Sequence, residues 1–173
     1  MEAGRGVGWG DGQPSAGAGG WRPAIHWRIP LGGMKRGVAV SLVDNTGSLS
    51  MQGRETLSEL AGRTCILAAR AFDVVRGRLT VDILRRQVSQ ACMDRLSLFA
   101  TLAGGSDLWR LDRPGEAAGI CFPVIPLVVE LYRTGPDRFE STVTLLVSGR
   151  AVHVNETHDR LGSRWLCTRL DMG

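Results

Sequence analysis

The chain has 173 residues, 43% of them hydrophobic and 22% charged, which is typical of a protein with a packed core and excludes a wholly disordered chain. Its formal net charge of +4 permits an acidic partner but requires none, and no run of about 18 apolar residues is present to span a membrane. The four cysteines form no Cys-x-x-Cys pair and the N-terminus lacks the apolar core of a signal peptide, so we expect a reduced, cytoplasmic protein without metal or other cofactor.

Residues 1–53 are predicted to be a flexible, Gly-rich tail. Between Gly4 and Gly20 the sequence mixes glycine, alanine, serine and proline without an apolar period. Such a segment buries too little surface to offset the entropy of ordering. Within the tail, only the stretch from Gly37 to Val43 has the pattern of a short strand. The folded part is therefore expected to be a single domain over residues 54–173.

Two to three helices are predicted to follow the tail. The first is expected to begin at Thr56, because Thr56 and Glu59 have the spacing of a capping box, and to end at the helix-capping Gly77. A short helix is expected over residues 80–86 and a third over roughly 89–103. The last two can also be read as one bent helix.

After a loop the apolar period changes to two, which is typical of strands. Four strands are predicted, over residues 127–132, 139–147, 151–157 and 165–172. Short connections between successive strands make an antiparallel meander. The predicted fold class is therefore α+β, with two to three N-terminal helices packed on one face of a four-stranded antiparallel meander sheet.

The last predicted strand carries apolar side chains on both faces. By strict alternation Leu166, Leu170 and Met172 share one face, and Trp165 and Cys167 share the other. Helices cover only one face, so the other needs a loop, the tail or a second subunit. We therefore predict that Trp165 lies at a contact surface, with a homodimer through the sheet as the favoured arrangement. The alternative is a tryptophan that covers the edge of the core.

Arg85 and Arg86 belong to the densest basic cluster of the sequence, which also contains Arg76, Arg78 and Arg95. Such a cluster suits an acidic partner or RNA, although a solvated helix face is the plainer interpretation. RNA-binding platforms stack bases on aromatic side chains, and none is interleaved with these arginines. Nucleic acid is therefore not the favoured partner.

No catalytic or metal site is predicted. Glu156 and His158 have the chemistry of metal ligands, but in an extended strand His153 points to the opposite face, and two ligands hold a metal poorly. No serine has a Gly-x-Ser-x-Gly context. An acid or base on the helices remains the catalytic alternative, and three aspartates are available for it: Asp73, Asp82 and Asp94.

Three segments carry a family resemblance: Ser148-Gly-Arg150, Val75-Arg-Gly-Arg-Leu-Thr80 and the terminal Arg164-Trp-Leu-Cys-Thr-Arg-Leu-Asp-Met-Gly173. Together they resemble an uncharacterised family of small actinobacterial proteins that end in Trp-x-Cys-Thr-x-Leu-x-x-Gly. The resemblance covers roughly residues 57–173 and implies no catalytic residue, because the family has no assigned activity. The layout is also similar to the cone-shaped folds of the nuclear-transport-factor-2-like type, which implies a pocket between helices and sheet.

Three functions remain open from the sequence. The leading expectation is a non-enzymatic interaction domain of the bacterial cytoplasm that binds another protein, because no catalytic constellation is evident. The first alternative is a pocket protein for a small apolar ligand, as the cone-like layout implies. The second is weak association with RNA or the ribosome, which the basic charge favours.

Overall fold

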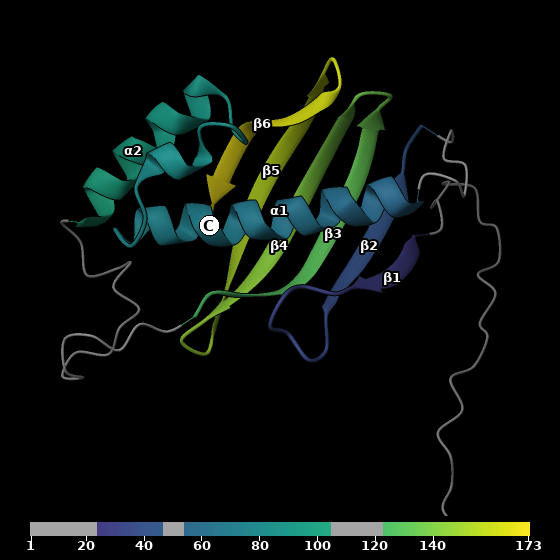
Figure 1. Cartoon of the computed structure of the whole chain (residues 1–173), viewed down its shortest axis with the longest axis horizontal. Coiled ribbons are helices and arrows are strands. Elements are labelled where there is room, and N and C mark those ends of the chain that lie inside the picture. Colours follow the sequence, from purple (N-terminus) through teal and green to yellow (C-terminus); the bar gives the residue numbers. More distant parts are fainter. Residues whose placement is uncertain (1–23, 47–53, 105–122) are drawn as a thin grey trace, which may run out of the picture.

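The computed structural model describes residues 24–46, 54–104 and 123–173. Within these residues six strands form one sheet, and two α-helices and a short 3-10 helix lie on one side of it (Figure 1). The architecture is therefore α+β, as the sequence predicts. Residues 1–23, which belong to the predicted tail, lie outside the described residues.

Two strands precede the first helix, and both lie inside the segment predicted to be a tail. β1 (Ile25–Ile29) pairs antiparallel with β2 (Val38–Asp44), and β2 pairs parallel with β3 (Ile125–Gly135). The predicted domain boundary at residue 54 is therefore wrong for residues 24–46. The sheet is six-stranded and mixed, whereas a four-stranded antiparallel sheet was expected.

Every second side chain of β2 from Val38 to Leu42 is apolar and faces the core, although β2 lies in a glycine-rich part of the sequence. Its inward residues Val38, Val40 and Leu42 are at most 2% exposed. β1 is tied to the first helix, because the Trp27 indole Nε1–H donates to Ser58 Oγ at 3.1 Å. A parallel pair needs a long crossover connection, and here the segment that contains the helices makes that crossover.

The predicted meander is confirmed for the four C-terminal strands. After β3 come β4 (Arg138–Val147), β5 (Arg150–Leu161) and β6 (Arg164–Met172), each antiparallel to its predecessor. The turn between β4 and β5 has φ of 50° at Ser148 and 77° at Gly149. Two successive positive φ values are those of the tight hairpin turn that matches the twist of paired strands.

The first helix, α1 (Arg54–Val75), begins two residues before the predicted N-cap. Thr56 therefore lies within the first turn, and the capping box expected there is wrong. The helix ends as predicted, because Gly77 has φ of 73° and its N–H donates to the Val74 carbonyl at 2.9 Å.

The second and third predicted helices are separate elements. A 3-10 helix, η2 (Val81–Leu84), is followed by α2 (Gln90–Gly104). Between them the chain runs along the edge of β6, where the Cys167 N–H donates to the Gln87 carbonyl at 2.9 Å and the Ser89 N–H donates to the Cys167 carbonyl at 2.8 Å. The Gln87 carbonyl and the Ser89 N–H are therefore not available for the hydrogen bonds of a continuous helix.

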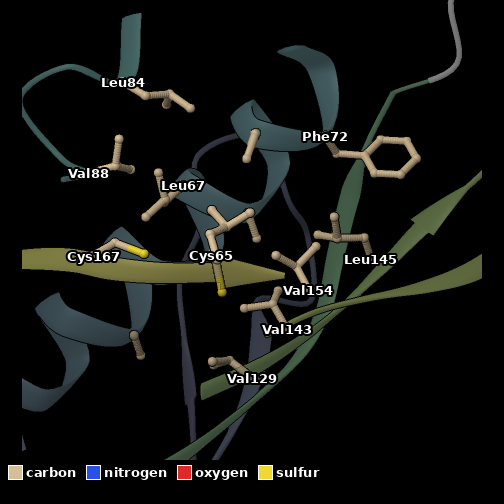
Figure 2. Close-up of a cluster of buried hydrophobic side chains, with 14 of the residues drawn as sticks. Cys65, Leu67, Phe72, Leu84, Val88, Val129, Val143, Leu145, Val154 and Cys167 are labelled. Atoms are coloured by element: carbon tan, nitrogen blue, oxygen red, sulfur yellow. The ribbon is translucent and has the colours of Figure 1, made fainter. Parts of the chain in front are cut away.

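The space between α1 and the sheet is filled by apolar side chains. Figure 2 shows Phe72 and Leu67 of α1 above Val129, Val143 and Val154 of the sheet. All five are at most 2% exposed. The interior is therefore packed at this position, and polar groups that reach it are surrounded by hydrocarbon.

Candidate interaction surface

Among the described residues, no helix covers the face of the sheet opposite α1 (Figure 1). Alternation turns the polar residues of β3 to β6 toward this side. They surround a hollow of about 380 Å³, whose side chains include Tyr132, Arg138, Glu140, Thr142, Asn155, Thr157, Arg169 and Asp171. We call this surface the open face.

Charges of both signs alternate across the open face. Arg138 lies 3.7 Å from Asp159 Oδ1 and 3.9 Å from Glu140 Oε1, and Arg169 Nε donates to Asp171 Oδ2 at 2.7 Å. The arginine side chains are more than half exposed, so each pair contributes little stability. These groups can exchange their present partners for those of another molecule at small cost.

Tyr132 gives the open face an aromatic side chain beside these charges. Burial, together with the nearby carboxylate of Glu130, raises the pKa of Tyr132. Its phenol therefore stays protonated at neutral pH and can donate a hydrogen bond. Tyrosine and arginine are the residues most enriched where protein interfaces carry their binding energy.

The structure places Trp165 on the helix side of the sheet, away from the open face. Thr157 pairs with Arg169 and His158 pairs with Cys167, so Thr168 is an extra residue, a β-bulge in β6. The bulge reverses the alternation, and residues on both sides of it turn inward. Strict alternation, from which a sheet homodimer was inferred, is therefore wrong for β6, and the homodimer itself stays a prediction.

Trp165 covers an edge of the core. It is half-buried, and its ring meets that of Phe139 edge-on with centroids 5.3 Å apart and planes at 71°. Beside it lies a narrow depression that is also lined by Gln87, Arg63 and His158. The depression has a volume of about 10 Å³, room for about one water molecule.

Arg85 and Arg86 lie between η2 and α2 and do not join the open face. Arg85 Nη2 is 3.4 Å from Asp82 Oδ1, and the two side chains are 77% and 70% exposed. The Arg86 carbonyl accepts a hydrogen bond from Arg164 Nη2 at 3.1 Å. The structure therefore brings Arg86 close to β6 and Trp165, while Arg85 remains on the helix surface.

The rest of the basic cluster is paired with aspartates. Arg76 Nη2 and Arg78 Nη1 lie 2.6 and 3.5 Å from Asp73 Oδ1, and Arg95 Nη2 lies 2.7 Å from Asp171 Oδ1. These contacts divide the arginines among separate ion pairs. Of the three aspartates considered as acid or base, Asp73 and Asp82 bind these arginines and Asp94 accepts from Gln90 Nε2 at 2.8 Å, so the structure does not bring the three together.

A cluster of polar side chains is buried under α1, and its burial was not predicted from the sequence. Glu156 and His158 of β5 share the inward face, as alternation predicts, and His158 Nε2 lies 2.7 Å from Glu156 Oε2. The Thr64 hydroxyl of α1 donates to the Leu60 carbonyl at 2.9 Å and lies 3.4 Å from His158 Nε2. All three polar side chains are buried.

Desolvation dominates the electrostatics of this cluster. Burial raises the pKa of Glu156, and its hydrogen bond and Coulomb interaction with His158 offset only part of that rise. Its second oxygen, Oε1, has no hydrogen-bond partner among the described residues. Burial and the nearby Glu156 also raise the pKa of Cys65 to about 12, so Cys65 is an unreactive thiol. A neutral carboxyl is the form that this environment favours.

The described residues contain no group of three or more histidine, cysteine or acidic side chains placed to hold a metal ion. Cys65, Cys92 and Cys167 are buried free thiols, and Cys121 lies outside the described residues. In the same described ranges, no helix is long and apolar enough to cross a membrane. No model of a known protein family, no curated protein and no solved structure matches the chain.

Proposed function

We propose that the protein is a non-enzymatic interaction domain that binds another protein through the open face of its sheet. The observation that carries the proposal is the placement of both α-helices on one side, which leaves Arg138 and Arg169 exposed and Tyr132 half-buried around the hollow on the other. An aromatic residue flanked by arginines and carboxylates is the composition expected at the centre and rim of a protein interface.

The poor accessibility of the buried polar cluster favours this proposal over catalysis in the interior. The polar cluster of Glu156, His158 and Thr64 has a chemistry suited to proton transfer, and its His158 lines the depression beside Trp165. That depression accommodates about one water molecule. Recognition on the surface therefore has stronger support than chemistry within the core.

The test compares two matched pairs of substitutions in the full chain. Tyr132→Ala with Arg169→Ala removes side chains of the open face, and Arg85→Ala with Arg86→Ala removes exposed charge on the helix side. Each variant is used to capture proteins from a native lysate, with quantification by mass spectrometry. We expect a stoichiometric partner that the wild type and the helix-side variant retain and the open-face variant loses. Loss in the helix-side variant alone, or no stoichiometric partner for the wild type, contradicts the proposal.

A second candidate, a protein that binds a small apolar ligand, is favoured by a groove elsewhere on the molecule. The groove has a volume of about 440 Å³ and lies between Ile66 of α1, the β1–β2 connection with Leu31 and Met34, and the segment before β3. This volume is within the range of ligand sites. Fluorescent apolar dyes should bind the wild type and not Ile66→Arg, and equal binding to both would remove this candidate.

Weak RNA association receives less support. Asp73, Asp82 and Asp171 lie beside the arginines of the basic cluster and reduce the positive field that a phosphate backbone would meet. Absence of binding to RNA at low salt would remove this alternative.

A further inference from the structure

Two of the buried thiols come from different elements and lie together. Cys92 belongs to α2 and Cys167 to β6, and Cys92 Sγ lies 3.6 Å from the Cys167 carbonyl oxygen. The two thiols lie close enough for each to shift the pKa of the other, and Cys167 Sγ donates to the Arg169 carbonyl at 3.0 Å. The backbone bonds of Cys167 to Gln87 and Ser89, at 2.9 and 2.8 Å, hold the start of α2 against β6. The pair is therefore fixed in position, although the two residues are far apart in the sequence.

The two sulfur atoms differ in how close they lie to solvent. Cys92 occupies the first turn of α2, directly after the exposed residues Gln90 and Ala91, and its N–H donates to Ser89 Oγ at 3.3 Å. Cys92 itself is 3% exposed, whereas Cys167 is completely buried. A small molecule that approaches from solvent therefore meets the Cys92 sulfur before the Cys167 sulfur.

The acidities of the thiols agree with this order. The hydrogen bond from Cys167, hydrogen bonds with Ser89 and the charge of Arg95 lower the pKa of Cys92 to about 6 against the effect of burial. The hydrogen bond with Cys92 and burial raise the pKa of Cys167. Cys92 is thus the more acidic thiol of the pair, and its thiolate is the nucleophilic form.

We propose that Cys92 and Cys167 are an oxidation site at which a peroxide forms a reversible disulfide between α2 and β6. The Cys92 thiolate attacks one peroxide oxygen; the S–O bond forms, the O–O bond breaks and hydroxide leaves, taking up a proton to become water. The Cys167 sulfur then attacks the Cys92 sulfur; the S–S bond forms, the S–O bond breaks and a second water leaves with the Cys167 proton. Two thiols are oxidised by two electrons and one peroxide is reduced to two waters.

A dithiol reductant reverses the bond by thiol–disulfide exchange. This modification site is independent of the proposed function, because neither cysteine lies on the open face. The third buried thiol, Cys65, is an internal control, since its raised pKa and burial keep it protonated.

The experiment maps disulfides by trypsin digestion of the intact protein after peroxide treatment and alkylation of remaining thiols. Trypsin places each cysteine on its own peptide, with Cys92 in 87–95, Cys167 in 165–169 and Cys65 in 64–70. We expect peptides 87–95 and 165–169 to be linked in the wild type and in Cys65→Ser, and to separate with dithiothreitol. We expect no link in Cys92→Ser.

A second measurement does not depend on any substitution. The rate at which iodoacetamide alkylates Cys92 in the folded wild type should rise with pH around a midpoint near 6, whereas Cys65 should remain unmodified throughout. Absence of the linked peptide pair, a link that involves Cys65 or Cys121 instead, or alkylation of Cys92 no faster than that of Cys65 overturns the proposal.

Discussion

Replacing Glu156 with glutamine should change how the stability of the protein depends on pH. Burial raises the folded-state pKa of Glu156 above its ordinary value of 4.5, so the folded chain holds a proton that the unfolded chain releases. The stability contributed by the neutral carboxyl is fully present below pH 4.5 and is lost as pH rises through the folded pKa. Glutamine is neutral in both states and removes this dependence.

The magnitude follows from proton linkage. One extra proton in the folded state makes the free energy of unfolding fall by about 1.4 kcal/mol for each pH unit over which the carboxyl stays protonated. Glu156→Gln should therefore be about as stable as the wild type near pH 4 and more stable near pH 8, because only the wild type loses the contribution of the neutral carboxyl as pH rises. The amide keeps the size of the side chain and can still pair with His158.

The assay is urea unfolding followed by circular dichroism across this pH range. Glu140→Gln is the matched control, because Glu140 is 52% exposed on the open face and should unfold with the wild-type pH dependence. A Glu156→Gln variant that keeps the wild-type slope of stability against pH, or that is less stable than the wild type at every pH, would refute this linkage.

Three further predictions concern the fold. Val143→Asp should abolish folding, because a carboxylate at this fully buried position costs several kcal/mol against a total stability of about 5–15 kcal/mol; a soluble variant with an unchanged Tm would be inconsistent with that. A chain that begins at residue 54 should not fold, since it lacks the buried Val38, Val40 and Leu42; a cooperative thermal transition for that chain would disprove the requirement for β2. Trp165→Ser should lower stability by about 2 kcal/mol through lost packing on Phe139 and leave the mass measured by light scattering unchanged; a fall in that mass would instead support the predicted contact role of Trp165.

Local patterns in the sequence predicted much of the fold. Alternation over Phe139 to Val147 identified β4, and Gly77 marked the end of α1. These features depend on neighbours along the chain, or on the turn that joins one strand to the next. The same locality explains why the meander was predicted with the correct order of strands.

Long-range pairing escaped prediction for a physical reason. The short segment Val38–Asp44 has strand character, but its place beside β3 depends on a crossover through both α-helices. A single-residue bulge also cannot be predicted from the alternation of the sequence. The bulge at Thr168 leaves Trp165 on the helix side of the sheet, whereas a contact surface on the other side was expected. The sequence correctly placed Glu156 and His158 on the same face of their strand. Their burial depends on α1, which packs above them and is distant in the sequence.

The open face is the central claim, and site-specific photo-crosslinking tests it most directly. A photoreactive amino acid is placed at position 142 on the open face or at position 85 on the helix side, and the full chain is irradiated inside cells of its source. We expect a discrete adduct with another protein from position 142 and none from position 85. An adduct from position 85 without one from position 142 would contradict the proposal.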